Sequence, residues 1–115
     1  MTAVNASRWA RILVVDDEPS NARLLARILE RAGYRDVRAT SDARTVVPLF
    51  REFRPDVVLM DLHMPHVDGF GLLDALRREM DDGEIVPVLV ITADPSRAAR
   101  ERAHRLGARD YVMKP

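Results

Sequence analysis

The sequence predicts an α/β domain in which five parallel strands form a doubly wound sheet with helices on both faces. Short aliphatic runs alternate along the chain with segments of helical periodicity, and strands that are joined through helices pair in parallel by right-handed crossovers. The runs DVVLMD and VPVLVITA are almost continuously apolar, which is typical of strands covered on both faces. A chain of 115 residues is long enough for one domain with a sizeable core.

Five segments have the aliphatic and β-branched composition that favours strands. The predicted strands cover residues 12–16, 36–40, 56–61, 87–92 and 110–114. Residues 1–8 carry no comparable pattern, so we expect a disordered tail there and a single domain over residues 9–115.

The first predicted helix lies between the first two strands and ends at Gly33, a residue type that is common just after helix C-termini. Its apolar residues share one face, which we expect to be buried, and its charged residues share the other. The apolar face consists of Leu24, Leu25, Ile28 and Leu29.

The second predicted helix follows Ser41 or Asp42, either of which is a suitable N-cap. Pro48 falls inside this helix and lacks a backbone N–H, so the helix should be kinked or frayed at its start. Its predicted buried residues are Val46, Val47 and Phe50.

The third predicted helix follows Asp68 and Gly69, where we expect the glycine to permit a turn. The fourth helix is expected from about residue 96 to residue 106, with Gly107 as its stop. The residues expected to face the core are Leu72, Leu73 and Leu76 in the third helix, and Ala99, Ala103 and Leu106 in the fourth.

The composition excludes several classes of protein. The 18 basic and 18 acidic residues balance, which gives no electrostatic case for nucleic-acid binding. The absence of cysteine excludes disulfides and thiol chemistry. No apolar run reaches the roughly 18 residues of a membrane span, and the N-terminus lacks a hydrophobic signal core, so the expected location is the cytoplasm.

Polar residues with complementary chemistry end four of the predicted strands. Asp16 and Asp17 end the first strand, Asp61 ends the third, Thr92 ends the fourth and Lys114 ends the fifth. Ligands of such sheets bind at the carboxyl ends of the strands, so these side chains should converge. All but one of the 18 basic residues are arginine, and the single lysine falls where a compact ammonium would be useful.

The three carboxylates predict a site for a hard cation, and Mg²⁺ suits one or two carboxylates together with water and phosphate oxygens. Beside Mg²⁺, the carboxylate of Asp61 could act as a nucleophile toward a phosphoryl group. The metal, the hydroxyl of Thr92 and the ammonium of Lys114 would share the charge on the phosphoryl oxygens.

The motifs VVDDEP, VLMDLHMPHVDGF, VPVLVITA and GARDYVMKP resemble those of the receiver domain of two-component response regulators. The resemblance covers about residues 10–115 and implies a flavodoxin-like fold with strand order 2-1-3-4-5. It implies a signalling module, rather than an enzyme with an external substrate, that takes a phosphoryl group from the phosphohistidine of a sensor kinase or phosphotransfer protein and switches an output domain.

The resemblance also implies a role for each site residue. Asp61 is the implied phosphoryl acceptor, and Mg²⁺ is held by Asp16, Asp17, Asp61 and the backbone carbonyl of His63. Thr92 bonds a phosphoryl oxygen and Lys114 pairs with it. Tyr111 corresponds to the switch aromatic, which moves inward as Thr92 is drawn toward the phosphoryl group.

Other functions are weighed against this interpretation. A small Mg²⁺-dependent phosphatase with an aspartyl nucleophile is one alternative, but haloacid-dehalogenase-like enzymes have a second Asp where this chain has His63. A protein-binding pseudo-receiver would lack an acid, the Thr or the Lys, and the receiver of a hybrid histidine kinase is a further alternative. A transition-metal site at Asp61, His63, His66 and Asp68 matches zinc spacing poorly.

The family closes with a fifth helix, and only four helices can be placed in this sequence. We therefore expect the chain to be a fragment of a longer protein, with the output domain following it. The first helix would cover one face of the sheet alone, and exposed apolar residues of the third to fifth strands would promote self-association.

Overall fold

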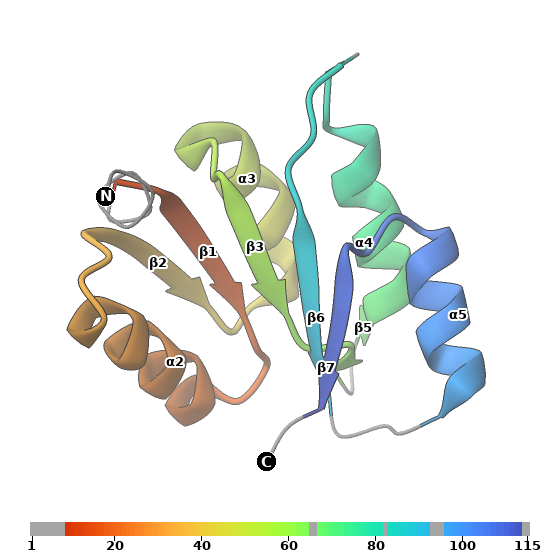
Figure 1. The fold of residues 1–115 in the computed structure, drawn as a ribbon, viewed down its shortest axis with the longest axis horizontal. Coiled ribbons are helices and arrows are strands. Elements are labelled where there is room, and N and C mark those ends of the chain that lie inside the picture. Colours follow the sequence, from red (N-terminus) through yellow and green to blue (C-terminus); the bar gives the residue numbers. More distant parts are fainter. Residues whose placement is uncertain (1–8, 65–66, 82, 93–95, 114–115) are drawn as a thin grey trace.

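The computed structural model describes residues 9–64, 67–81, 83–92 and 96–113. Five parallel strands form one sheet in the order β2-β1-β3-β6-β7 (Figure 1). The predicted doubly wound sheet and the order implied by the family resemblance are therefore confirmed. These strands are β1 (Arg11–Val15), β2 (Asp36–Thr40), β3 (Val57–Met60), β6 (Val88–Thr92) and β7 (Asp110–Met113).

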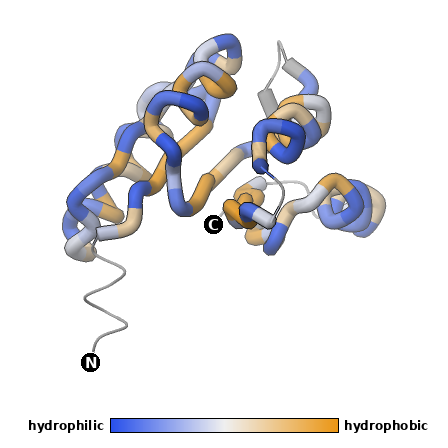
Figure 2. The backbone as a smooth tube through the Cα atoms, turned by 90° about the horizontal axis from the view of Figure 1, so that it is seen from above, coloured by the Kyte–Doolittle hydropathy of each residue, from blue (hydrophilic) through white to orange (hydrophobic). Residues whose placement is uncertain are grey.

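Four α-helices connect the strands within the described residues, each close to its predicted position. They are α2 (Pro19–Arg31), α3 (Val46–Phe53), α4 (Gly69–Arg78) and α5 (Arg97–Arg105). Each helix combines hydrophobic and hydrophilic residues around its turns (Figure 2), as helices that pack on a sheet by one side must do. No helix in the described part of the chain is both long enough and apolar enough to cross a membrane.

The second predicted helix starts as a short 3-10 helix, and its α-helical part begins shortly before Pro48. Asp42 caps a short 3-10 helix, η1 (Ala43–Thr45), by accepting a hydrogen bond of 3.0 Å from the backbone N–H of Arg44. The α-helix α3 begins only at Val46, so Pro48 lies in its first turn. The N–H groups of a first turn have no acceptor within the helix, and proline is tolerated there because it has no such group.

The three helices α3, α4 and α5 cover one face of the sheet. Their buried residues join those of β1, β3 and β6 in one core cluster, in which Leu76 and Val90 are fully buried and Leu73 is 1% exposed. The residues expected to face inward from the third helix are all buried. Of those expected from the fourth, Ala103 is fully buried and Ala99 and Leu106 are partly buried.

Within the described residues, the opposite face is covered by one helix, α2, which contacts β1 and β2. Directly beneath this helix Ile12 and Val14 are 3% and 0% exposed. Their partners along the sheet are only half-buried, and Val112 at the edge is 45% exposed. The half-buried residues are Val57, Leu59, Leu89 and Ile91.

The expectation that all four apolar residues of the first helix are buried was wrong. Ala22 is the buried residue of α2, whereas Leu24 and Ile28 are 56% and 52% exposed. Leu25 and Leu29 are half-buried. One helix on a sheet buries a narrow stripe, and no second helix among the described residues packs beside α2 to cover the flank that carries Leu24 and Ile28.

A small hairpin that the sequence analysis did not anticipate follows β3. Its strands are β4 (His63–Met64) and β5 (Val67–Asp68), with His63 paired to Asp68. The hairpin leads directly into α4, whose first turn is capped by the Asp68 carboxylate accepting a 3.1 Å hydrogen bond from the N–H of Phe70. The segment between β3 and α4 is thus short, and the hydrogen bond between Asp68 and Phe70 fixes its C-terminal end.

Candidate functional site

The sheet itself places two of the predicted acids side by side. Asp16 follows β1 and its backbone N–H donates to the carbonyl of Thr40 at 3.2 Å. Asp61 follows β3 and its N–H donates to the carbonyl of Val15 at 2.9 Å. The parallel hydrogen-bond pattern therefore continues one residue beyond each strand, which fixes the backbone from which both carboxylates start.

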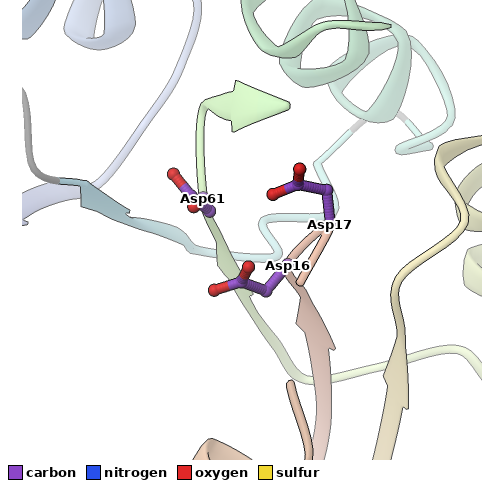
Figure 3. Close-up of side chains that lie close together, drawn as sticks. All are labelled: Asp16, Asp17 and Asp61. Carbon is purple, nitrogen blue, oxygen red and sulfur yellow. The ribbon is translucent and has the colours of Figure 1, made fainter. Parts of the chain in front are cut away.

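Asp16, Asp17 and Asp61 form a cluster of carboxylates at this carboxyl edge of the sheet (Figure 3). One carboxylate oxygen from each residue lies within 4.8 Å of the others. Asp16 is 1% exposed and Asp61 is 5% exposed, while Asp17 is half-buried. Like charges on neighbouring carboxylates repel one another, and the two buried ones also lose hydration, so the cluster favours a cation beside it.

The third acid of the Asp16-Asp17-Glu18 run is not part of this cluster. The Glu18 carboxylate instead caps α2, accepting hydrogen bonds from the hydroxyl of Ser20 at 2.9 Å and from its N–H at 3.4 Å. The backbone N–H of Glu18 donates to Oδ1 of Asp16 at 3.0 Å. The Glu18 carboxylate is thus engaged at the start of α2 rather than in the cluster, and the backbone N–H of Glu18 holds the Asp16 carboxylate. The sequence analysis missed this contribution.

The donor set of the cluster fits a hard divalent cation. All three side chains offer carboxylate oxygens, and the chain has no cysteine. Oxygen ligands with few protein carboxylates suit Mg²⁺, which keeps several waters. Asp68, which belongs to the alternative transition-metal set, is exposed and caps α4 instead.

Thr92 and Tyr111 lie on the neighbouring strands. Thr92 is the last residue of β6 and is completely buried. Tyr111 in β7 pairs with Val90 of β6 and packs against the core beneath α5. Its ring is partly buried, and the guanidinium carbon of Arg100 lies 5.4 Å from its centroid.

The remaining predicted site residues are His63 and Lys114, together with His66 of the alternative metal set. His63 lies in β4, two residues after Asp61, and its backbone pairs with Asp68. Lys114 and His66 lie outside the described residues. The structure thus brings together Asp16, Asp17 and Asp61, and it places Thr92 at the end of the adjacent strand.

The chain is similar in sequence to proteins that contain a receiver domain. Residues 12–115 match the family model of the response regulator receiver domain. The chain is 39% identical over 105 residues to a probable transcriptional regulator, ycf27, of Porphyridium aerugineum, covering 91% of this chain and 42% of that protein. It therefore spans about two fifths of the length of that relative.

Solved structures share the fold. The chemotaxis protein CheY4 of Vibrio cholerae superposes with a TM-score of 0.85 at 29% identity, over 93% of this chain and 88% of that one. A response regulator from Burkholderia pseudomallei, which contains a phosphorylated aspartic acid and a calcium ion, gives a TM-score of 0.82 at 32% identity. That match covers 92% of this chain and 60% of the other.

Proposed function

Because the chain belongs to the response regulator receiver domain family of two-component signalling, we propose that Asp61 is its phosphoryl acceptor. The observation that carries this proposal is the position of the Asp61 carboxylate, at the carboxyl end of β3 and in one cluster with Asp16 and Asp17. The phosphorylated aspartic acid in the similar Burkholderia pseudomallei protein supports the same chemistry.

In the proposed reaction, an oxygen of the Asp61 carboxylate attacks the phosphorus atom of a phosphohistidine on the partner kinase. The bond between phosphorus and the imidazole nitrogen breaks, and its electron pair stays on that nitrogen, which takes up a proton. The product is an acyl phosphate on Asp61. No strong base is needed at Asp61 because an ionised carboxylate is already a nucleophile.

Mg²⁺ is the proposed metal, and when bound it would offset charge on the phosphoryl oxygens. Asp16 and Asp17 would hold it together with Asp61 and the backbone carbonyl of His63. Thr92 would donate its hydroxyl proton to a phosphoryl oxygen, and the Lys114 ammonium would pair with another. Thr92 and Asp61 are buried, so water would compete little with the hydroxyl of Thr92 for the phosphoryl oxygen.

In the proposed switch, phosphorylation of Asp61 changes the position of Thr92, and Thr92 in turn changes the position of Tyr111. A groove of about 510 Å³ lies beside Tyr111, between α5 and β7. Its basic lining residues are Arg100, His104, Arg105 and Arg109. If Tyr111 moves inward as Thr92 engages the phosphoryl group, the contact with Arg100 is lost and the groove changes shape, which is how an output partner would sense phosphorylation.

We further propose a sensor histidine kinase or phosphotransfer protein as the donor, and an output domain or protein as the recipient of the signal. The chain spans 42% of the length of ycf27, which supports a position as one domain of a longer regulator. The proposed location is the cytoplasm. The whole protein's activity would then depend on that output domain.

The test of the acceptor uses acetyl phosphate with Mg²⁺ and intact-mass measurement. We expect one phosphoryl group that hydroxylamine removes, no incorporation in Asp61→Asn, and slower incorporation in Lys114→Arg because a guanidinium is larger and differently shaped. Asp68→Asn is the matched control, since it removes a nearby carboxylate outside the cluster. Full incorporation into Asp61→Asn would show that the nucleophile is another residue.

The test of the metal is thermal unfolding with and without millimolar Mg²⁺, with NaCl at equal ionic strength as the comparison. Wild type should be stabilised by Mg²⁺, by about 2.7 kcal/mol at 100 times the Kd. Asp17→Asn should melt higher than wild type without metal, because one repelling charge is gone, and should lose most of the response. A wild type that responds equally to both salts would contradict the metal site.

A further inference from the structure

We propose that Gly69 is a positioning residue for the phosphoryl-accepting site. Because it has no side chain, the first residue of α4 can contact the backbone of Leu62, and this contact sets the path of residues 61–63. The inference rests on the proposed function, since it concerns the geometry of the cluster that contains Asp61.

The contact is too close for any other residue at position 69. A Cβ atom there would lie 2.4 Å from the carbonyl oxygen of Leu62, 2.7 Å from its Cα and 2.9 Å from its carbonyl carbon. All three are backbone atoms, so no change of side-chain rotamer relieves the overlap. Gly69 is not among the glycines with positive φ, which are Gly33, Gly83 and Gly107. The expectation that it permits a turn is corrected: it permits a close approach.

The neighbours of Leu62 make this contact relevant to the site. Leu62 follows Asp61, whose N–H is bonded to Val15 of β1 at 2.9 Å, and it precedes His63, whose carbonyl is a proposed Mg²⁺ ligand. Leu62 is itself 8% exposed and part of the core. The segment is therefore held by β1 on one side and by the start of α4 on the other, at the base of the β4–β5 hairpin.

An added methyl at residue 69 must separate α4 from Leu62. The displacement reaches Asp61 and His63 through a single peptide unit on each side. Mg²⁺ requires nearly octahedral ligands at about 2.0–2.1 Å, so a shift of a few tenths of an ångström at two of its proposed ligands weakens binding and misplaces the nucleophile.

The same helix supplies a matched control. Gly71 is exposed, and the three heavy atoms nearest to a Cβ atom there belong to the side chain of Asp68, with Oδ2 the closest at 3.3 Å. Gly69→Ala and Gly71→Ala add the same methyl group to the first turn of α4 and raise helix propensity alike. They differ in whether the methyl meets a backbone or a movable side chain.

The experiment measures the Mg²⁺ dissociation constant by calorimetry and the rate of phosphorylation by acetyl phosphate at saturating Mg²⁺, well below the melting temperature. We expect Gly69→Ala to raise the dissociation constant by about tenfold or more, as for other residues that orient metal ligands, and to slow phosphorylation. Gly71→Ala should match wild type. Val86→Ala, a buried site before β6, controls for lost stability and should bind Mg²⁺ normally.

A second pair of variants tests the same idea without a steric clash. Asp68→Asn and Asp68→Ala both remove one charge, but asparagine can still cap α4 and alanine cannot. We expect only Asp68→Ala to weaken Mg²⁺ binding, so the proposal stays testable if Gly69→Ala does not fold.

The outcomes separate this inference from the proposed function. It is overturned if folded Gly69→Ala binds Mg²⁺ and is phosphorylated like wild type, or if Val86→Ala loses affinity equally. If Gly69→Ala does not fold, equal affinities of the two Asp68 variants overturn it. If wild type itself neither binds Mg²⁺ nor incorporates phosphate at Asp61, the proposed function fails, whatever the glycine variants do.

Discussion

On the face beneath α3, α4 and α5, the inward residues of β1, β3 and β6 are all buried, whereas on the face beneath α2 burial decreases across the sheet. Val14 of β1 is fully buried, its neighbours in β3 and β6 are half-buried, and Val112 of β7 is 45% exposed. The same strands contribute to both faces, so the difference arises from the helices. Apolar sequence makes a strand suitable for burial, but a helix must lie over it.

This difference implies an unequal distribution of stability. Burial of apolar surface is the main favourable term in folding, at about 25 cal/mol per Å². The three-helix face therefore supplies most of the stabilisation, and the α2 face supplies it chiefly through β1. Substitutions that remove the same atoms from the two faces should differ in effect.

The largest expected effect is that of Leu76→Ala, on the covered face. Leu76 is completely buried in α4, so its truncation should lower the free energy of unfolding by about 2–5 kcal/mol. Leu24→Ala removes the same atoms from a side chain that is 56% exposed and should cost less than about 1 kcal/mol. Urea unfolding of both variants measures the difference, and equal losses would refute the contrast between the faces.

A smaller effect is expected from Ile28→Lys on the incompletely covered face. Ile28 is 52% exposed, so the change in unfolding free energy should stay within about 0.5 kcal/mol. The added charge should reduce self-association, which the apolar residues of this face and the zero net charge favour. Light scattering over a concentration series tests this, with Arg31→Lys as a control on the same helix. Wild type that stays monomeric at every concentration would contradict it.

The smallest expected effect concerns an exposed ion pair that joins α3 to the end of α4 over the covered face. The guanidinium of Arg51 donates two hydrogen bonds to the carboxylate of Glu79, which lowers the pKa of Glu79 below its ordinary value. A lowered folded-state pKa stabilises the fold above the unfolded pKa, and this contribution is lost as the pH falls through the folded one. Glu79→Gln should slightly flatten the acid limb of the stability–pH curve. An unchanged acid limb would show that solvent screening removes the effect.

The sequence was sufficient to predict the five strands of the main sheet to within about one residue and to place the acids at one edge, but not the β4–β5 hairpin. Those features depend on local composition and on a general property of parallel sheets. The exposure of Leu24 and Ile28 was not predictable in the same way. Helical periodicity shows which residues share a face, but it does not show how wide a surface the neighbouring elements offer.

Two features of the site depended on tertiary contacts that leave little trace in the sequence. The sequence shows that Glu18 is a third acid beside Asp16 and Asp17, but its role as the cap of α2 follows from the hydrogen bonds that its side chain makes with Ser20. The role of Gly69 depends on Leu62 lying against α4. A glycine directly after an N-cap aspartate was a usable signal, since α4 would otherwise gain from alanine there.

The pairing of β1 with both β2 and β3 has a consequence for the order in which the molecule is assembled. The three clustered carboxylates all belong to residues 16–61, and they meet once β3 lies beside β1. Translation adds roughly 5–20 residues per second, so this meeting can occur seconds before β6 and β7 leave the ribosome. In the nascent half-domain the three carboxylates would then repel one another while the core is still small, because β6 and β7 have not yet joined the sheet. A divalent cation from the surrounding solution would stabilise this intermediate until they do.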